Sequence, residues 1–211
     1  MIGSVTSLLT GIIEQLHGLT GNYGVAIIIL TILIRVVLLP LTSSQTRAMK
    51  KMQQLQPEIQ KLQKKYRNDP QRLNQETMAL WREHKVNPLS GCLPLLIQLP
   101  FLWAFFAALR GYDFQADPSF LWIADLANPD PIVLPVLTGL STYVMTRMTS
   151  ATSADPSQRV MLYVMPVFLG YITRNFPAGL AVYWVTSNLF QIAQQYVMDW
   201  ADRRSVKGEA G

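Results

Sequence analysis

The chain has 211 residues, of which 50% are hydrophobic and only 15% are charged, and its formal net charge is +5. Soluble domains usually carry about 25% charged residues, so this composition argues against a water-soluble protein. The single cysteine excludes an internal disulfide, and no cluster of Cys and His residues resembles a metal site. The sequence therefore favours an all-α integral membrane protein that carries no cofactor and no metal.

Residues 1–19 carry apolar side chains at helical spacing, with polar side chains on the other faces. This pattern predicts an amphipathic helix lying on the outer membrane surface, with a helix packed on the protein itself as the alternative. We expect Gly18, Gly21 and Asn22 to break this helix before the next apolar stretch begins.

Five apolar stretches follow within residues 20–211, which we expect to form the core of the protein. A helix needs about 20 mostly apolar residues, at about 1.5 Å each, to cross a hydrocarbon core about 30 Å thick. Four stretches meet or approach that length, whereas the fourth in order is shorter and is compatible with one arm of a buried hairpin. We predict transmembrane helices over about residues 23–42, 88–109, 131–148, 159–174 and 177–198.

The segment 43–86, between the first two stretches, is polar and charged, with apolar residues again at helical spacing. Asp69 is a good N-cap and Pro70 suits a first helical position, so we expect two helices joined by a turn in an antiparallel hairpin. Pro57 should kink or restart the first arm. The charges of this hairpin form either a solvated face, or a surface for docking, regulation or contact with anionic lipid heads.

The distribution of basic residues sets the orientation. If all five stretches cross, 15 of the 18 Lys and Arg residues fall on the side of the hairpin and of the tail 199–211. Lys and Arg accumulate on the cytoplasmic side, so we predict an outside N-terminus and a cytoplasmic C-terminus. The basic excess then reflects topology, and we expect no direct binding of nucleic acid. The outer loop 110–130 has side chains that suit a segment resting at the outer interface: Phe114, Phe120, Trp122 and Ile123.

Arg35 lies inside the first apolar stretch, where a charge costs from about 2.5 to about 17 kcal/mol. All 13 Asp and Glu residues lie outside the apolar stretches or at their margins, so the sequence offers no carboxylate at that depth. We therefore expect Arg35 to face a water-containing cavity, open to the cytoplasm because Thr42 lies only about 10 Å further along the helix. Thr31, one turn away, could help to solvate it. A structural arginine bonded to backbone carbonyls and hydroxyls of neighbouring helices is the alternative.

The fifth stretch carries polar side chains at spacings of three and four residues, which place them on one face of a helix. In lipid this face must meet protein or water, and interhelical hydrogen bonds are the ordinary explanation. The stripe consists of Trp184, Ser187, Asn188, Gln191 and Gln195. Further polar surface comes from Gln98 in the second stretch and from Thr138, Ser141, Thr142 and Thr146 in the third. None of these arrangements predicts catalysis.

Several motifs stand in order along the chain. They are Arg35 with Leu39-Pro40-Leu41; Asn87-Pro88-Leu89 with residues 91–100; Phe120-Leu121-Trp122-Ile123 with Asp125-Leu126 and Asp130-Pro131; and Phe176-Pro177-Ala178-Gly179-Leu180 through Tyr183-Trp184 to Ser187-Asn188-Leu189 and Gln194-Gln195. Over about residues 20–200, these motifs and their spacing resemble the signatures of the YidC/Oxa/Alb family of membrane protein insertases.

The resemblance implies a five-helix bundle in the bacterial plasma membrane, with a hydrophilic groove open to the cytoplasm and to lipid but closed outside. Arg35 and Trp184 match groove positions of the family, as does Thr146. In the family the arginine attracts the translocated tail of the substrate. Unlike in Gram-negative members, we expect no large extracytoplasmic domain before the first crossing. The tail has only three basic residues, so we do not expect strong ribosome binding through it.

We therefore predict an ATP-independent membrane protein insertase and chaperone rather than an enzyme, with nascent membrane proteins and membrane lipids as partners. The ribosome, the signal recognition pathway and the Sec translocon are further candidate partners. An anion channel or small-solute transporter that uses Arg35 as its selectivity charge is the alternative, and a scaffold whose hairpin recruits partners is a third possibility. The predicted groove residues are Arg35, Thr31, Gln98, Thr146, Trp184, Ser187, Asn188 and Gln191.

Overall fold

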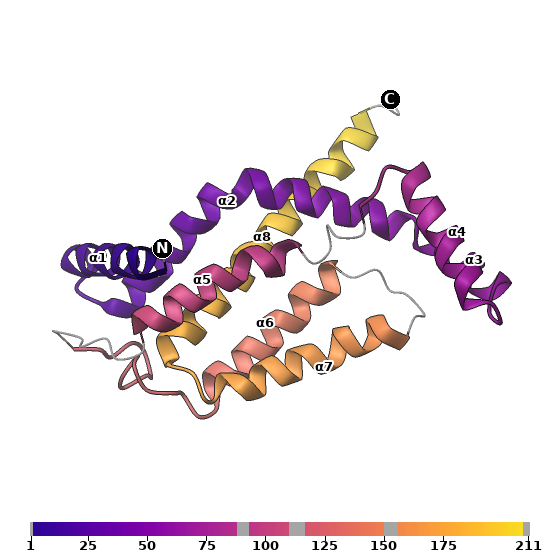
Figure 1. Ribbon diagram of the computed structural model, residues 1–211. Coiled ribbons are helices and arrows are strands. Elements are labelled where there is room, and N and C mark those ends of the chain that lie inside the picture. The colour runs from indigo at the N-terminus through magenta and orange to yellow at the C-terminus, as the bar shows by residue number, and fades with distance from the viewer. Residues whose placement is uncertain (1, 88–92, 110–116, 150–155, 209–211) are drawn as a thin grey trace.

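The computed structural model describes residues 2–87, 93–109, 117–149 and 156–208, and these ranges are helical apart from turns, loops and one isolated bridge between Phe120 and Ile123 (Figure 1). The predictions for Cys92 and Phe114 lie outside the described residues. The helices are α1 (Ile2–Thr20), α2 (Tyr23–Gln54), α3 (Gln56–Lys65), α4 (Pro70–Glu83), α5 (Leu93–Leu109), α6 (Val133–Thr149), α7 (Pro156–Thr173) and α8 (Ala178–Gly208).

The joint between α1 and α2 is built from two residues that suit a helix end. Gly21 has φ +68°, which glycine adopts without strain, and the Asn22 side chain accepts a hydrogen bond from the Val25 amide at 3.2 Å. Gly18, by contrast, lies inside α1. The expected break between the amphipathic helix and the first apolar stretch therefore occurs at Gly21 and Asn22.

The first apolar helix is longer than predicted. We expected it to end near residue 42, but α2 continues through Pro40 to Gln54, and Leu55 separates it from α3. Pro57 lies in the first turn of α3, where its missing N–H costs no helical hydrogen bond, so the expected restart occurs there. Similarly, α8 extends to Gly208, so the first part of the predicted tail is helical.

The helices α3 and α4 pack against each other. Asp69 caps α4 by accepting from the Arg72 amide at 3.0 Å, and Pro70 is the first helical residue, as expected. Residues from the start of α3 pack against the end of α4 in a small separate core. This core contains Leu55, Ile59 and Val86, with Met52, Leu80 and Trp81 packed against it.

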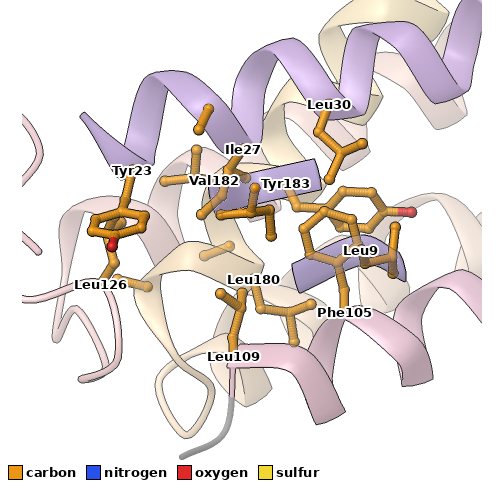
Figure 2. Packing of buried hydrophobic residues seen from close by; sticks show 14 of the residues in the cluster. Leu9, Tyr23, Ile27, Leu30, Phe105, Leu109, Leu126, Leu180, Val182 and Tyr183 are labelled. Atoms are coloured by element: carbon orange, nitrogen blue, oxygen red, sulfur yellow. The ribbon is translucent and has the colours of Figure 1, made fainter. Parts of the chain in front are cut away.

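The larger core joins α1, α2, α5, α8 and the loop after residue 116 (Figure 2). Phe105 and Tyr183 stack at its centre with ring centroids 4.3 Å apart. Leu9 and Ile13 of α1 are buried in the same core, so one face of α1 packs on the protein, as the alternative interpretation proposed. Leu8 and Leu19 of α1 remain exposed.

The helices α6 and α7 run side by side (Figure 1) and approach closely at two glycines. A Cβ atom on Gly170 would lie 2.9 Å from the carbonyl oxygen of Pro135, and one on Gly139 would lie 3.2 Å from that of Pro166. Small residues that let two backbones approach are typical of helix contacts in membranes. α6 also packs against α8, which in turn packs against α2.

Among the described residues, α2 is the one helix that is both long and apolar enough to span a membrane on length and composition. The apolar stretches Gln98–Leu109 and Leu162–Thr173 are shorter. Different helices and helix ends lie at the two ends of the bundle. α1 and the starts of α2, α6 and α8 lie at one end, whereas α3, α4 and the end of α8 lie at the other (Figure 1).

Candidate functional site

Arg35 lies on the inner face of α2, with only 8% of its surface exposed. Its Nη2 donates a hydrogen bond to Gln98 Oε1 of α5 at 3.1 Å. When the Gln191 amide on α8 is turned so that both of its ends find partners, its oxygen accepts from Arg35 Nη1 at 3.3 Å and from Nη2 at 3.0 Å. Arg35 therefore bridges two helices through two neutral amides.

Gln98 is itself held from the other side. Its Nε2 donates to the Tyr183 hydroxyl at 2.6 Å, and the Tyr183 ring stacks on Phe105 in the core. These two hydrogen bonds connect Arg35 through Gln98 to Tyr183, and they link the charge to the packed centre of the bundle. Tyr183 belongs to the motif around Trp184 but was not among the predicted groove residues. Its spacing of four and eight residues from Ser187 and Gln191 places it on the same helix face and could have indicated it.

The partners of Arg35 are uncharged. In the described part of the chain, the ion pair given by the structure joins Lys50 and Asp199 at 2.7 Å, and none includes Arg35. A guanidinium has five N–H donors, and two amide oxygens satisfy only part of them. An incoming carboxylate could therefore bind this group without displacing an internal carboxylate.

The polar stripe on α8 divides between two neighbouring helices. Asn188 Nδ2 donates to Ser141 Oγ at 3.1 Å and to Thr142 Oγ1 at 2.9 Å, both on α6. Trp184 Nε1 lies 3.4 Å from the same Thr142 oxygen. For these two residues of α8 the structure gives interhelical hydrogen bonds, the ordinary explanation for such a stripe, while Gln191 turns towards Arg35 on α2.

Thr31, Ser187 and Thr146 are the remaining predicted site residues. Thr31 is fully buried, and its hydroxyl donates to the Ile27 carbonyl of its own helix at 2.6 Å. Ser187 is 2% exposed and lies between the two parts of the stripe, and Thr146 is half-buried near the end of α6. Within the described residues the structure gives neither threonine a side-chain bond to Arg35.

A second polar seam joins α2 to α8 further along both helices, and the sequence analysis missed it. Gln194 exchanges hydrogen bonds with Thr42 at 3.0 to 3.2 Å and donates to Ser43 at 3.1 Å. Beyond it, Asp199 pairs with Lys50 and accepts from Gln195 at 3.2 Å. Gln194 and Gln195 occur in the quoted motif, but no sequence pattern names their partners on α2. Polar contacts therefore join α2 to α8 beyond the bond between Arg35 and Gln191.

An apolar hollow lies between α5, α7 and α8. Trp184 is one of the residues that line it, so the hollow begins where the polar stripe of α8 starts. The other side chains that line it are Leu102, Leu169, Ile172, Thr173, Phe176, Leu180 and Ala181. α8 thus lines the apolar hollow through Leu180, Ala181 and Trp184 and contacts the buried cation of α2 through Gln191.

The family model described as "60Kd inner membrane protein" matches residues 15–204. A membrane protein insertase YidC from Caldanaerobacter subterraneus subsp. tengcongensis is 44% identical over 210 residues, which are 99% of this chain and 100% of that protein. One from Fusobacterium nucleatum subsp. nucleatum is 51% identical over 177 residues, 83% of this chain and 85% of that protein. One from Geobacter sulfurreducens is 43% identical over 87% of this chain but only 35% of its own length.

A solved structure gives the same result. The crystal structure described as an active YidC insertase with the first transmembrane domain resolved has a TM-score of 0.77 and 35% sequence identity. The similarity covers 92% of this chain and 46% of that chain. On these matches, the chain belongs to the 60Kd inner membrane protein family, which includes the YidC membrane protein insertases.

Proposed function

We propose that this protein inserts newly made membrane proteins into the lipid bilayer, with Arg35 as the group that attracts the polar segment to be translocated. The observation that carries the proposal is a buried guanidinium whose partners, Gln98 and Gln191, are neutral amides. Membership of a family that includes membrane protein insertases supports the activity. It favours an insertase over the channel or transporter that the sequence alone left open.

The proposal includes five crossings, made by α2, α5, α6, α7 and α8. Large apolar side chains are exposed on each of these helices, including Val37, Trp103, Leu140, Val167 and Leu189. Such a surface is unfavourable in water but suits hydrocarbon. The distribution of Lys and Arg supports a topology with α3, α4 and the C-terminus in the cytoplasm, and α1 with the loop 117–130 outside the plasma membrane.

Insertion begins in this account with electrostatic capture. A substrate carboxylate about 4 Å from Arg35 gains about 4 kcal/mol at an effective dielectric constant of 20. Gln98 and Gln191 hold the guanidinium in place, and Tyr183 holds Gln98 in turn. The polar segment is then hydrated part of the way across, which lowers the desolvation barrier that it would meet in lipid.

The apolar part of the substrate needs a different surface. The hollow between α5, α7 and α8 offers one next to Trp184. We propose that an apolar side chain of a nascent transmembrane segment packs into this hollow while the polar end of the segment is near Arg35. The charged α3–α4 pair is the surface we propose for cytoplasmic partners, with the ribosome, the signal recognition pathway and the Sec translocon as candidates.

Photo-crosslinking during insertion tests this placement. A photoreactive amino acid at Gln191, beside Arg35, should crosslink to a nascent single-spanning protein with a short acidic tail, in proteoliposomes that contain the purified chain. The matched control position is Leu189, which lies on the same helix and whose side chain is 56% exposed. Crosslinks to the substrate at both positions with equal yield, or at neither during active insertion, would contradict a site around Arg35.

A further inference from the structure

The loop before α6 contains a tight turn that turns two apolar side chains outwards. The Phe120 amide donates to the Ile123 carbonyl at 2.9 Å, and the Ile123 amide donates to the Phe120 carbonyl at 2.8 Å. Between them, Leu121 is 75% exposed and Trp122 is 50% exposed. The chain is uncharged from residue 118 to residue 124. The tip of this turn is therefore a small apolar surface.

Leu121 adopts a backbone conformation that leucine avoids. Its φ is +54°, in the left-handed region that favours glycine and asparagine. Such a residue persists only where the surrounding structure holds it. Ile123 is 6% exposed in the main core, and Phe120 covers Gly24 so closely that a Cβ there would lie 2.1 Å from the Phe120 ring. These two inward side chains hold the turn in the form that points Leu121 outwards.

The turn is also tied to the ends of two helices. Trp122 Nε1 donates to Asp130 Oδ2 at 3.0 Å, and Asp130 Oδ1 accepts from the amides of Ile132 and Leu134 at the start of α6. On the other side, Asn22 Nδ2 donates to the Ser119 carbonyl at 3.0 Å, at the joint between α1 and α2. The turn is therefore a rigid element at the end where α2 and α6 begin (Figure 1).

Exposed apolar side chains continue from the turn along its neighbours. Leu19, three residues before the α1–α2 joint residue Asn22, is 84% exposed. On α6, the exposed face carries Ile132, Val136 and Leu140 at 67%, 61% and 58%. In the proposed topology this face of α6 lies against lipid, so the turn stands at the outer end of a lipid-facing surface.

We propose that Leu121 and Trp122 form an anchor that inserts into the outer membrane interface and fixes the level at which α2 and α6 enter the bilayer. The partner is the lipid surface itself, at the boundary between head groups and acyl chains. Tryptophan with a bonded indole N–H and an exposed apolar ring suits that boundary. The inference rests on the topology under Proposed function, but it adds a contact that insertion alone does not require.

Spin labels in lipid nanodiscs test the anchor directly. In a Cys92→Ala background, which removes the single cysteine, a nitroxide is attached to Leu121→Cys, to Asn128→Cys as the reference in water, or to Leu140→Cys as the reference in lipid. Collision with oxygen and with a water-soluble nickel complex reports depth. The label at 121 should favour oxygen, as the label at 140 does, whereas the label at 128 should favour nickel. A label at 121 that matches the one at 128 would overturn the anchor while leaving the spans intact, and nickel access at 140 would overturn both.

A second variant separates anchoring from packing. Asparagine tolerates φ +54°, so Leu121→Asn should leave the midpoint of thermal unfolding in detergent unchanged or raise it. A lowered midpoint would mean that Leu121 serves the fold, and it would overturn the proposal.

Discussion

Replacing Gln98 with glutamate should affect stability and function in opposite directions. The substitution is nearly isosteric and places a carboxylate oxygen where Gln98 Oε1 now lies, 3.1 Å from Arg35 Nη2. Tyr183, whose oxygen is 2.6 Å from Gln98 Nε2, can turn its hydroxyl hydrogen to donate to the new carboxylate. The variant thus gives Arg35 an internal counter-ion, where the described part of the native chain gives it the neutral amides of Gln98 and Gln191.

The magnitude follows from the charges. Charge centres about 4 Å apart attract by about 4 kcal/mol at an effective dielectric constant of 20. Desolvation of the carboxylate offsets part of this, so we expect thermal stability in detergent to be equal to that of the native protein or higher. The same internal pair competes with a substrate carboxylate for Arg35. If the internal pair removes only a third of the attraction between Arg35 and the substrate carboxylate, the affinity of the site for that carboxylate falls about tenfold.

The assay compares insertion of one single-spanning substrate, with an acidic tail or with a neutral tail, into proteoliposomes. Gln98→Glu should lower insertion of the acidic form most. Gln194→Glu is the matched control, because Gln194 bonds Thr42 and Ser43 rather than Arg35. If Gln98→Glu inserts the acidic substrate as well as the native protein does, the neutral surroundings of Arg35 have no role in capture.

Two further predictions concern the helix contacts. Gly170→Ala should destabilise the protein by about 1–3 kcal/mol in detergent unfolding, because the new Cβ would lie 2.9 Å from the backbone oxygen of Pro135. Gly11→Ala, with nothing within 4 Å of its Cβ, is the control and should be neutral or stabilising; equal losses for both would refute the close contact. Asn188→Leu removes two hydrogen bonds to α6 and should cost about 1 kcal/mol, measured the same way, and a loss above about 3 kcal/mol would show that the bonds do more than join the helices.

Local chemistry explains which parts of the fold the sequence could predict. Asp69 with Pro70 starts α4, and Gly21 with Asn22 separates α1 from α2, because caps and turns depend on residues next to each other in the chain. Pro57 restarts the helix for the same reason. By contrast, α2 continues past the predicted limit at residue 42, because a polar sequence with helical spacing contains no signal that ends a helix.

Contacts between segments that are distant in the sequence were harder to predict. The sequence placed Arg35 and Gln98 among the groove residues, but their hydrogen bond spans 63 positions and depends on how α2 and α5 pack. The bond between Trp122 and Asp130 and the positive φ of Leu121 arise in the same way, because a turn is set by the core that it covers. α1 shows the limit of an amphipathic pattern, since a face that suits lipid also suits packing against the protein.

The claim that Arg35 attracts the acidic segment of a substrate is tested most directly by changing the charge at position 35 and on the substrate tail. Native protein, Arg35→Lys and Arg35→Glu are each reconstituted and supplied with a single-spanning substrate whose short tail carries either acidic or basic residues. Native protein should prefer the acidic tail, and Arg35→Lys should retain much of that preference because a point charge supplies the attraction. Arg35→Glu should lose the preference and insert the acidic tail poorly. Undiminished insertion of the acidic tail by Arg35→Glu would contradict electrostatic capture by Arg35.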